Sequence, residues 1–244
     1  MPVLTLPSPQ PAALRARLHG FNLLPSRLWH PARMPAWQQE LQALGPLAGQ
    51  PALQQQLHRR WSGQLLAQLG AGAAPVTDSA QPALALALAT PALLAQLQRQ
   101  AGVLLLAPRL RRMVERSQVL ALRAALGAEL LHWAYAEAGQ LHPGLGEGHA
   151  WLDESALASD PAQAEPAQRW AARADLLGAG LLAQSWQDAP INLRARADGR
   201  LPPAADDPAL RQASGLDAGR ARRLCLELLQ LLDAPWLSSF PVTP

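Results

Sequence analysis

Residues 93–135 read LLAQLQRQAGVLLLAPRLRRMVERSQVLALRAALGAELLHWAY, and they form the longest segment in which apolar residues recur at helical spacing. Thr90-Pro91 precedes this segment as a helix start, because threonine caps a first turn and proline is accepted at its first position. The apolar face that follows consists of Leu93, Leu94, Leu97, Ala101, Leu104 and Leu105. Pro108 is expected to end this helix and to separate it from the next.

A second helix is predicted from Arg109 to about Ala138. One of its sides is apolar throughout, at about 100° per residue. The opposite side is basic at first and becomes apolar from Val119 onward, where Leu122, Leu126, Leu130 and Trp133 follow. We therefore expect this helix to begin at the surface and its second half to form the centre of the fold.

Arg109, Arg111, Arg112 and Arg116 form a basic cluster in a chain whose 21 basic residues are all arginine. Positive charge at a helix start opposes the helix dipole, at a cost of about 0.3–1 kcal/mol for each exposed residue. Two interpretations remain open. The cluster is either a solvated face, paired in part with the acidic residues in 153–165, or a docking site for an acidic partner.

Composition favours a folded, soluble chain. The 244 residues are 49% hydrophobic and 16% charged, which is enough apolar material for a core. The net charge of +3 is small for a nucleic-acid-binding protein, which usually shows a larger, localised basic excess. The single cysteine, Cys225, excludes an internal disulfide and is expected to be a small buried residue.

No segment has the roughly 20 uninterrupted apolar residues of a membrane span. The best candidate, residues 83–107, is broken by a proline, glutamines and an arginine. The first ten residues lack the basic start and apolar run of a signal peptide. We therefore expect a cytoplasmic protein.

The predicted fold class is mostly α, as a single irregular multi-helix domain over residues 11–244 behind a flexible tail at 1–10. Loops at about 70–81 and 141–168 are expected to be mobile. Further helices are predicted at residues 37–44, 51–69, 170–186 and 216–232. One short strand or hairpin is allowed near residues 191–201, because apolar residues alternate there before the Asp198-Gly199 turn signal.

Residues 21–37 are broken by three prolines but rich in aromatic side chains, among them Trp29 and Trp37. Large aromatic residues usually bury, so these should pin a short-helix segment to the core. The alternative is that Trp29 and Trp37 belong to a surface for a partner protein.

No catalytic, cofactor-binding or metal-binding motif appears, and we expect no enzyme and no cofactor. The only cluster that could ligate a metal is His142 and His149, with Glu147 and Asp153 nearby. This cluster lacks a recognised ligand spacing, so we expect the segment to be a loop that holds no metal.

Three stretches together resemble the SctK family (YscK and PscK type) of bacterial type III secretion proteins. They are FNLLPSRL at 21–28, AGVLLLAPRLRRMVERSQVLALRAALGAELLHWA at 101–134, and residues 178–202, where a small-residue helix and a tryptophan precede an arginine-alternating stretch. The resemblance covers somewhat over a third of the chain. It implies a non-enzymatic adaptor of the injectisome sorting platform, at the inner membrane only through its partners. These are the cytoplasmic domain of the SctD-type ring protein and the SctQ-type pod protein.

Three other classes remain as alternatives. A nucleic-acid-binding regulator would use the cluster Arg109–Arg116 and would bind duplex DNA in a salt-dependent way. A hydrolase with a dispersed site would need a group with a strongly shifted pKa in a cleft. A secretion chaperone would usually be smaller and acidic, which the pI of about 10.3 disfavours.

Overall fold

The structure, a computed structural model, describes residues 12–142, 145 and 166–240. Within these ranges every regular element is a helix, which confirms the mostly α prediction. The longer helices are α1 (Ala12–Leu23), α2 (Pro35–Leu44), α3 (Pro51–Leu69), α5 (Pro91–Leu110), α6 (Arg116–Leu126), α7 (Ala128–Ala136), α10 (Pro166–Ser185), α11 (Ile191–Asp198) and α13 (Ala218–Leu232). The shorter ones are α4 (Leu84–Ala87), α8 (Ala138–Leu141), α12 (Pro208–Gln212) and α14 (Ala234–Ser238), with 3₁₀ turns η1 (Pro25–Arg27), η2 (Pro31–Arg33), η3 (Gly45–Gly49), η4 (Gly70–Ala73) and η6 (Pro203–Asp206).

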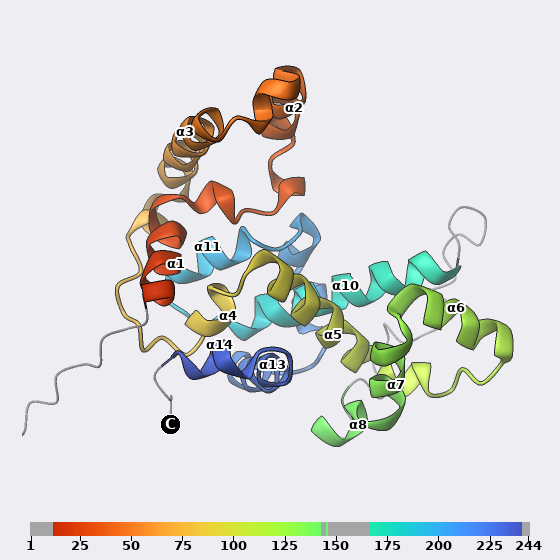
Figure 1. Ribbon diagram of the computed structural model, residues 1–244. Helices are drawn as coiled ribbons and strands as arrows, with labels where there is room; N and C mark the ends of the chain where they lie inside the picture. Colours follow the sequence, from red (N-terminus) through yellow and green to blue (C-terminus); the bar gives the residue numbers. More distant parts are fainter. Residues whose placement is uncertain (1–11, 143–144, 146–165, 241–244) are drawn as a thin grey trace, which may run out of the picture.

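Helices α5 and α10 pack against each other at the centre of the molecule (Figure 1). The predicted threonine cap starts α5, since Thr90 Oγ1 accepts a hydrogen bond of 3.1 Å from the Leu93 amide. Apart from its first turn and a few polar positions, α5 is buried almost all round. Such a helix belongs in the middle of a fold rather than on its surface.

The other helices cover this pair on several sides. α13 packs on both α5 and α10, α12 packs on α10, and α11 packs on η4 and α4. The C-terminal α14 is fastened by Trp236, whose indole N–H donates to the Ala85 carbonyl at 3.0 Å. At the far end, α6 packs on α10, whereas α7 and α8 pack on α5.

Helices α2 and α3 stand off from this core, as Figure 1 shows. Leu57, Trp61 and Leu65 of α3 are buried apart from the main core. Trp37 of α2 stacks on Trp61, with ring centroids 4.9 Å apart and planes 8° from parallel. Both helices end as predicted, since α2 stops at Gly45-Pro46 and α3 spans the predicted residues. The two helices therefore form a lobe with a small core of its own.

The single long helix predicted from Arg109 to Ala138 was wrong. α5 runs through Pro108 to Leu110, residues 111–115 form a turn, and Gly127, with φ 87°, separates α6 from α7. Proline removes one backbone donor, but this loss falls in the last turn, where Leu110 is fully buried. The centre of the fold is accordingly α5, and the residues after Val119 cover one end of it.

The short strand or hairpin allowed near residues 191–201 is not formed, because Ile191–Asp198 is the helix α11. The buried residues Leu193, Arg196 and Ala197 are three and four positions apart, so the helical period accounts for them. Alternation over so few residues fits either period, and no neighbouring strand is present in the described ranges to pair with this one.

The division into a tail at 1–10 and one domain over 11–244 stays a prediction, and the tail lies outside the described residues. The same holds for most of the predicted loop at 141–168, although α10 already begins at Pro166. In the predicted loop at 70–81, Gly72 and Val76 are buried. Of the helices that the structure describes, none is both long enough and apolar enough to cross a bilayer.

Candidate functional site

The sequence predicts the arginine cluster at the start of a helix, but in the structure only Arg116 begins one. Arg109 lies in the last turn of α5, with its guanidinium 5.6 Å from the ring centre of Trp170. Arg111 caps the same helix end and donates from Nε to the Ala107 carbonyl at 3.3 Å. At a helix C-terminus positive charge is favourable, so these two arginines stabilise α5.

Arg112 and Arg116 lie further out, in the turn after α5 and at the first position of α6. The turn is held by Tyr135, whose hydroxyl donates to the Met113 carbonyl at 3.1 Å. Only Arg116 therefore has the unfavourable position at a helix start on which the docking hypothesis was based. The side chains of Arg112 and Arg116 are both exposed.

We call residues 109–126 the basic end of the molecule. They contain five arginines and one glutamate, a net charge of +4, whereas the whole chain carries +3. Over the ranges that the structure covers, Arg112, Arg116 and Arg123 form no ion pair. Val114 and Leu120 beside them are 81% and 55% exposed. Residues 153–165, the acidic partners considered from the sequence, lie outside the described residues.

Trp29 and Trp37 are brought together at the base of the α2–α3 lobe. Both line a hollow of about 330 Å³, together with Arg33, Gln64 and Gln68, which we call the Trp29–Trp37 hollow. Both indoles are half-buried, so each takes part in packing and also borders an open space. That Trp29 and Trp37 belong to a surface for a partner protein stays a prediction.

The segment that carries Trp29 is fastened to the turn after α11. The His30 amide donates to the Gly199 carbonyl at 2.8 Å, and Arg33 Nε donates to the Leu201 carbonyl at 2.7 Å. A Cβ on Gly199 would overlap the Trp29 ring, so the absence of a side chain there makes room for the indole. Residues that are far apart in sequence thus fix the position of Trp29.

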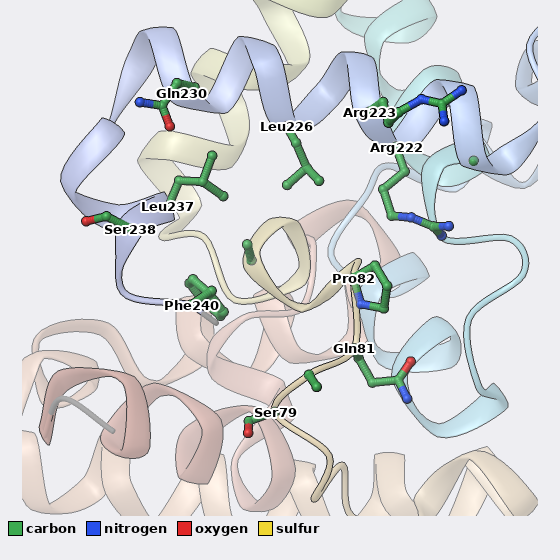
Figure 2. A pocket seen from close by; sticks show the side chains of 13 residues that line it. Ser79, Gln81, Pro82, Arg222, Arg223, Leu226, Gln230, Leu237, Ser238 and Phe240 are labelled. Carbon is green, nitrogen blue, oxygen red and sulfur yellow. The ribbon is translucent and has the colours of Figure 1, made fainter. Parts of the chain in front are cut away.

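Another hollow, of about 690 Å³, is a groove beside α13. Figure 2 shows Arg222 and Arg223 at one end, Leu226 in the middle, and Leu237 and Phe240 at the other end. Arg222 is partly neutralised by Asp188, with Nη1 and Oδ1 2.6 Å apart. The groove is thus mainly apolar, with a basic mouth.

No group of three or more histidine, cysteine, aspartate or glutamate side chains in the described ranges could hold a metal ion. Of the sequence cluster considered for this role, only His142 lies within those ranges. His149, Glu147 and Asp153 lie outside them.

Arg196 and Arg200 are buried, and the sequence pattern did not predict this. Arg196 is 1% exposed and donates to the carbonyls of Gly72, Ala73 and Ala74, which fastens α11 to η4. Its sequence signal was its position three residues after Leu193 and one before Ala197, on the apolar face of a helix. A strand over residues 191–201 has a period of two, which does not group Arg196 with Leu193 and Ala197 on one face.

Comparison with protein-family models, with curated proteins and with solved structures finds no match for this chain.

Proposed function

We propose that the chain is a non-enzymatic adaptor of a type III secretion sorting platform, of the SctK type. It would link the cytoplasmic domain of an SctD-type ring protein to an SctQ-type pod protein. It would act in the cytoplasm and be held at the inner membrane by these partners, with no small-molecule substrate or nucleic acid in this role. The resemblance of residues 21–28, 101–134 and 178–202 supports the choice of family.

The observation that carries the adaptor proposal is the basic end. Its exposed arginines lack ion-pair partners within the described ranges, and exposed apolar side chains lie between them. The planar guanidinium group binds carboxylates with two parallel hydrogen bonds, and arginine is enriched in protein interfaces. This combination of charge and apolar area suits an acidic protein surface.

An adaptor also needs a second, separate surface. The Trp29–Trp37 hollow lies at the base of the α2–α3 lobe, and Figure 1 shows α2 and α6 on different sides of the molecule. Half-buried tryptophans beside a hollow are typical anchor points in protein interfaces. Two partners could therefore bind at the same time without overlap.

The test is a charge reversal at the basic end, Arg112→Glu with Arg116→Glu, in binding assays with purified ring-type and pod-type proteins. The matched control is Arg59→Glu with Arg220→Glu, two exposed arginines outside both surfaces. Like charges brought together in an interface cost several kcal/mol, so one of the two affinities should fall at least about tenfold. The control should bind as the unchanged chain does.

Equal affinities for the reversal, the control and the unchanged chain would reject the basic end as a docking site. The rival function, a nucleic-acid-binding regulator, predicts instead that the unchanged chain binds random duplex DNA and loses it steeply with added salt.

A further inference from the structure

A third hollow also has Trp29 in its wall. It has a volume of about 460 Å³ and is bounded by η1, the segment 28–31, the first half of α5, Asp175 of α10 and Arg200. Pockets for small ligands typically measure about 300–1,000 Å³. We call it the Arg200 hollow.

Arg200 is the unusual member of its wall, because the side chain is a buried cation with no carboxylate beside it. The residue is 5% exposed, and its two terminal nitrogens donate to the carbonyls of Ala87 and Ala89. Within the described ranges its Nε–H has no acceptor. Burial of a charged group is costly unless hydrogen bonds and an opposite charge compensate it.

The one carboxylate in the wall is already engaged. Asp175 accepts from Nε and Nη2 of Arg99, the latter at 2.6 Å, so that this pair is neutral. Arg27, which also lines the hollow, is exposed and forms no ion pair with any residue that the structure describes. The wall therefore carries an uncompensated charge of about +2, from Arg27 and Arg200.

The pKa values agree with this charge count. Burial, and then repulsion by Arg17, lower the pKa of Arg200 to about 10, as expected where no anion offsets the charge. Burial and the nearby Arg33 lower the pKa of His30, so His30 adds no charge at neutral pH.

Apart from Gln98 the remaining wall is apolar, and it includes Trp29, Leu28, Leu94 and Pro31. The 20-residue helix α5 begins at this hollow with Pro91, and the dipole at its N-terminus adds positive potential to the hollow. A bare inorganic ion would leave these apolar groups without a contact. An organic anion with a flat ring would cover them and could stack on the indole.

We propose that the Arg200 hollow binds a small organic oxyanion, a carboxylate or phosphate attached to a flat apolar group. The oxyanion lies between Arg27 and Arg200, and its ring lies against Trp29. Binding supplies the missing counter-charge of Arg200. This site goes beyond the adaptor function and does not depend on it.

The experiment measures binding of phenyl phosphate, benzoate and benzyl alcohol to the full chain by calorimetry and ligand-observed NMR. Benzyl alcohol is the neutral counterpart of the two anions. We expect at least one anion to bind saturably and more tightly than benzyl alcohol, and the stronger of the two to identify the oxyanion class. Arg27→Gln should weaken that binding about tenfold. Arg59→Gln, on the exposed side of α3, should leave it unchanged.

Arg27 is chosen for the test because it is exposed and its replacement leaves the buried Arg200 network intact. The proposal is overturned if neither anion binds saturably. It is also overturned if benzyl alcohol binds as well as the anions, or if Arg27→Gln and Arg59→Gln have the same effect. None of these results depends on the binding of partner proteins, so failure here and failure of the adaptor proposal are distinguishable.

Discussion

Gly178 of α10 lies directly against Gly102 of α5, so that a Cβ on Gly178 would be 3.0 Å from the Gly102 amide nitrogen. The same Cβ would overlap the carbonyl oxygen of Gln98, and a Cβ on Gly102 would overlap the carbonyl of Ala174. The two helix backbones are therefore in direct contact, and no side chain fits between them. This contact brings α10 against the most buried helix of the chain.

Gly102→Ala and Gly178→Ala should each destabilise the fold, because the added methyl group forces α5 and α10 apart. We expect a loss of about 1–3 kcal/mol in the free energy of unfolding, measured by urea denaturation. Gly63→Ala is the control, since nothing lies within 4 Å of its Cβ on α3. There the better helix propensity of alanine should stabilise by up to about 1 kcal/mol. Equal effects at all three positions would contradict the close packing of α5 on α10.

Arg196→Met should destabilise the chain by about 1–3 kcal/mol, because the carbonyls of Gly72, Ala73 and Ala74 lose their donor in a buried place. Urea denaturation measures this change. Arg194→Met is the matched control, since Arg194 is two residues away and makes a single exposed hydrogen bond, to the Gln187 carbonyl. A loss no larger than that of the control would mean that Arg196 does not fasten α11 to η4.

Lowering the pH from about 7.5 to about 5.5 should reduce the free energy of unfolding, in part through His58. Burial, and then the charge of Arg27, lower the pKa of His58 below its usual value of 6.5. The unfolded chain therefore binds more protons than the folded chain in this range. The stability that His58 contributes above pH 6.5 is lost as the pH falls from 6.5 through the lower pKa of the folded state. Its Nδ1 lies 2.9 Å from the Ser26 hydroxyl, which suits the neutral ring.

His58→Gln should make the melting temperature less sensitive to pH over this range. His19→Gln, at an exposed position of α1, is the control for the loss of a histidine. If both variants keep the slope of the unchanged chain, His58 is not one of the groups that cause it.

Cys225 should not react with a disulfide reagent such as DTNB while the chain is folded. The thiol is fully buried, and burial raises its pKa to about 12, so almost no thiolate exists at neutral pH. Full reaction is expected once guanidinium chloride unfolds the chain. Fast labelling of the native chain would show that α13 opens readily.

The helices bounded by proline and glycine could be predicted from the sequence, because these residues act locally. The bounds of α3 and the cap of α5 are examples. Gly178 could be placed in the predicted helix at 170–186. Its partner Gly102 could not be identified, since a contact between residues 76 positions apart depends on the arrangement of the helices.

The errors arose where local rules competed with burial. Pro108 did not end α5 because Leu110 is buried beyond it, and the alternation in 191–197 was read with the wrong period. For the candidate site, the arginines and tryptophans could be named from the sequence, but not their grouping. Trp29 and Trp37 share one hollow, whereas the basic end lies on another side of the molecule.

The most direct test of the adaptor proposal is capture of the tagged chain from a lysate of its own host at moderate salt, with mass spectrometry of the retained proteins. The account predicts that an injectisome pod protein or ring protein is recovered, and that the Arg112→Glu, Arg116→Glu variant recovers less of at least one of them. Recovery of nucleic acid alone, or of neither injectisome protein, would contradict it.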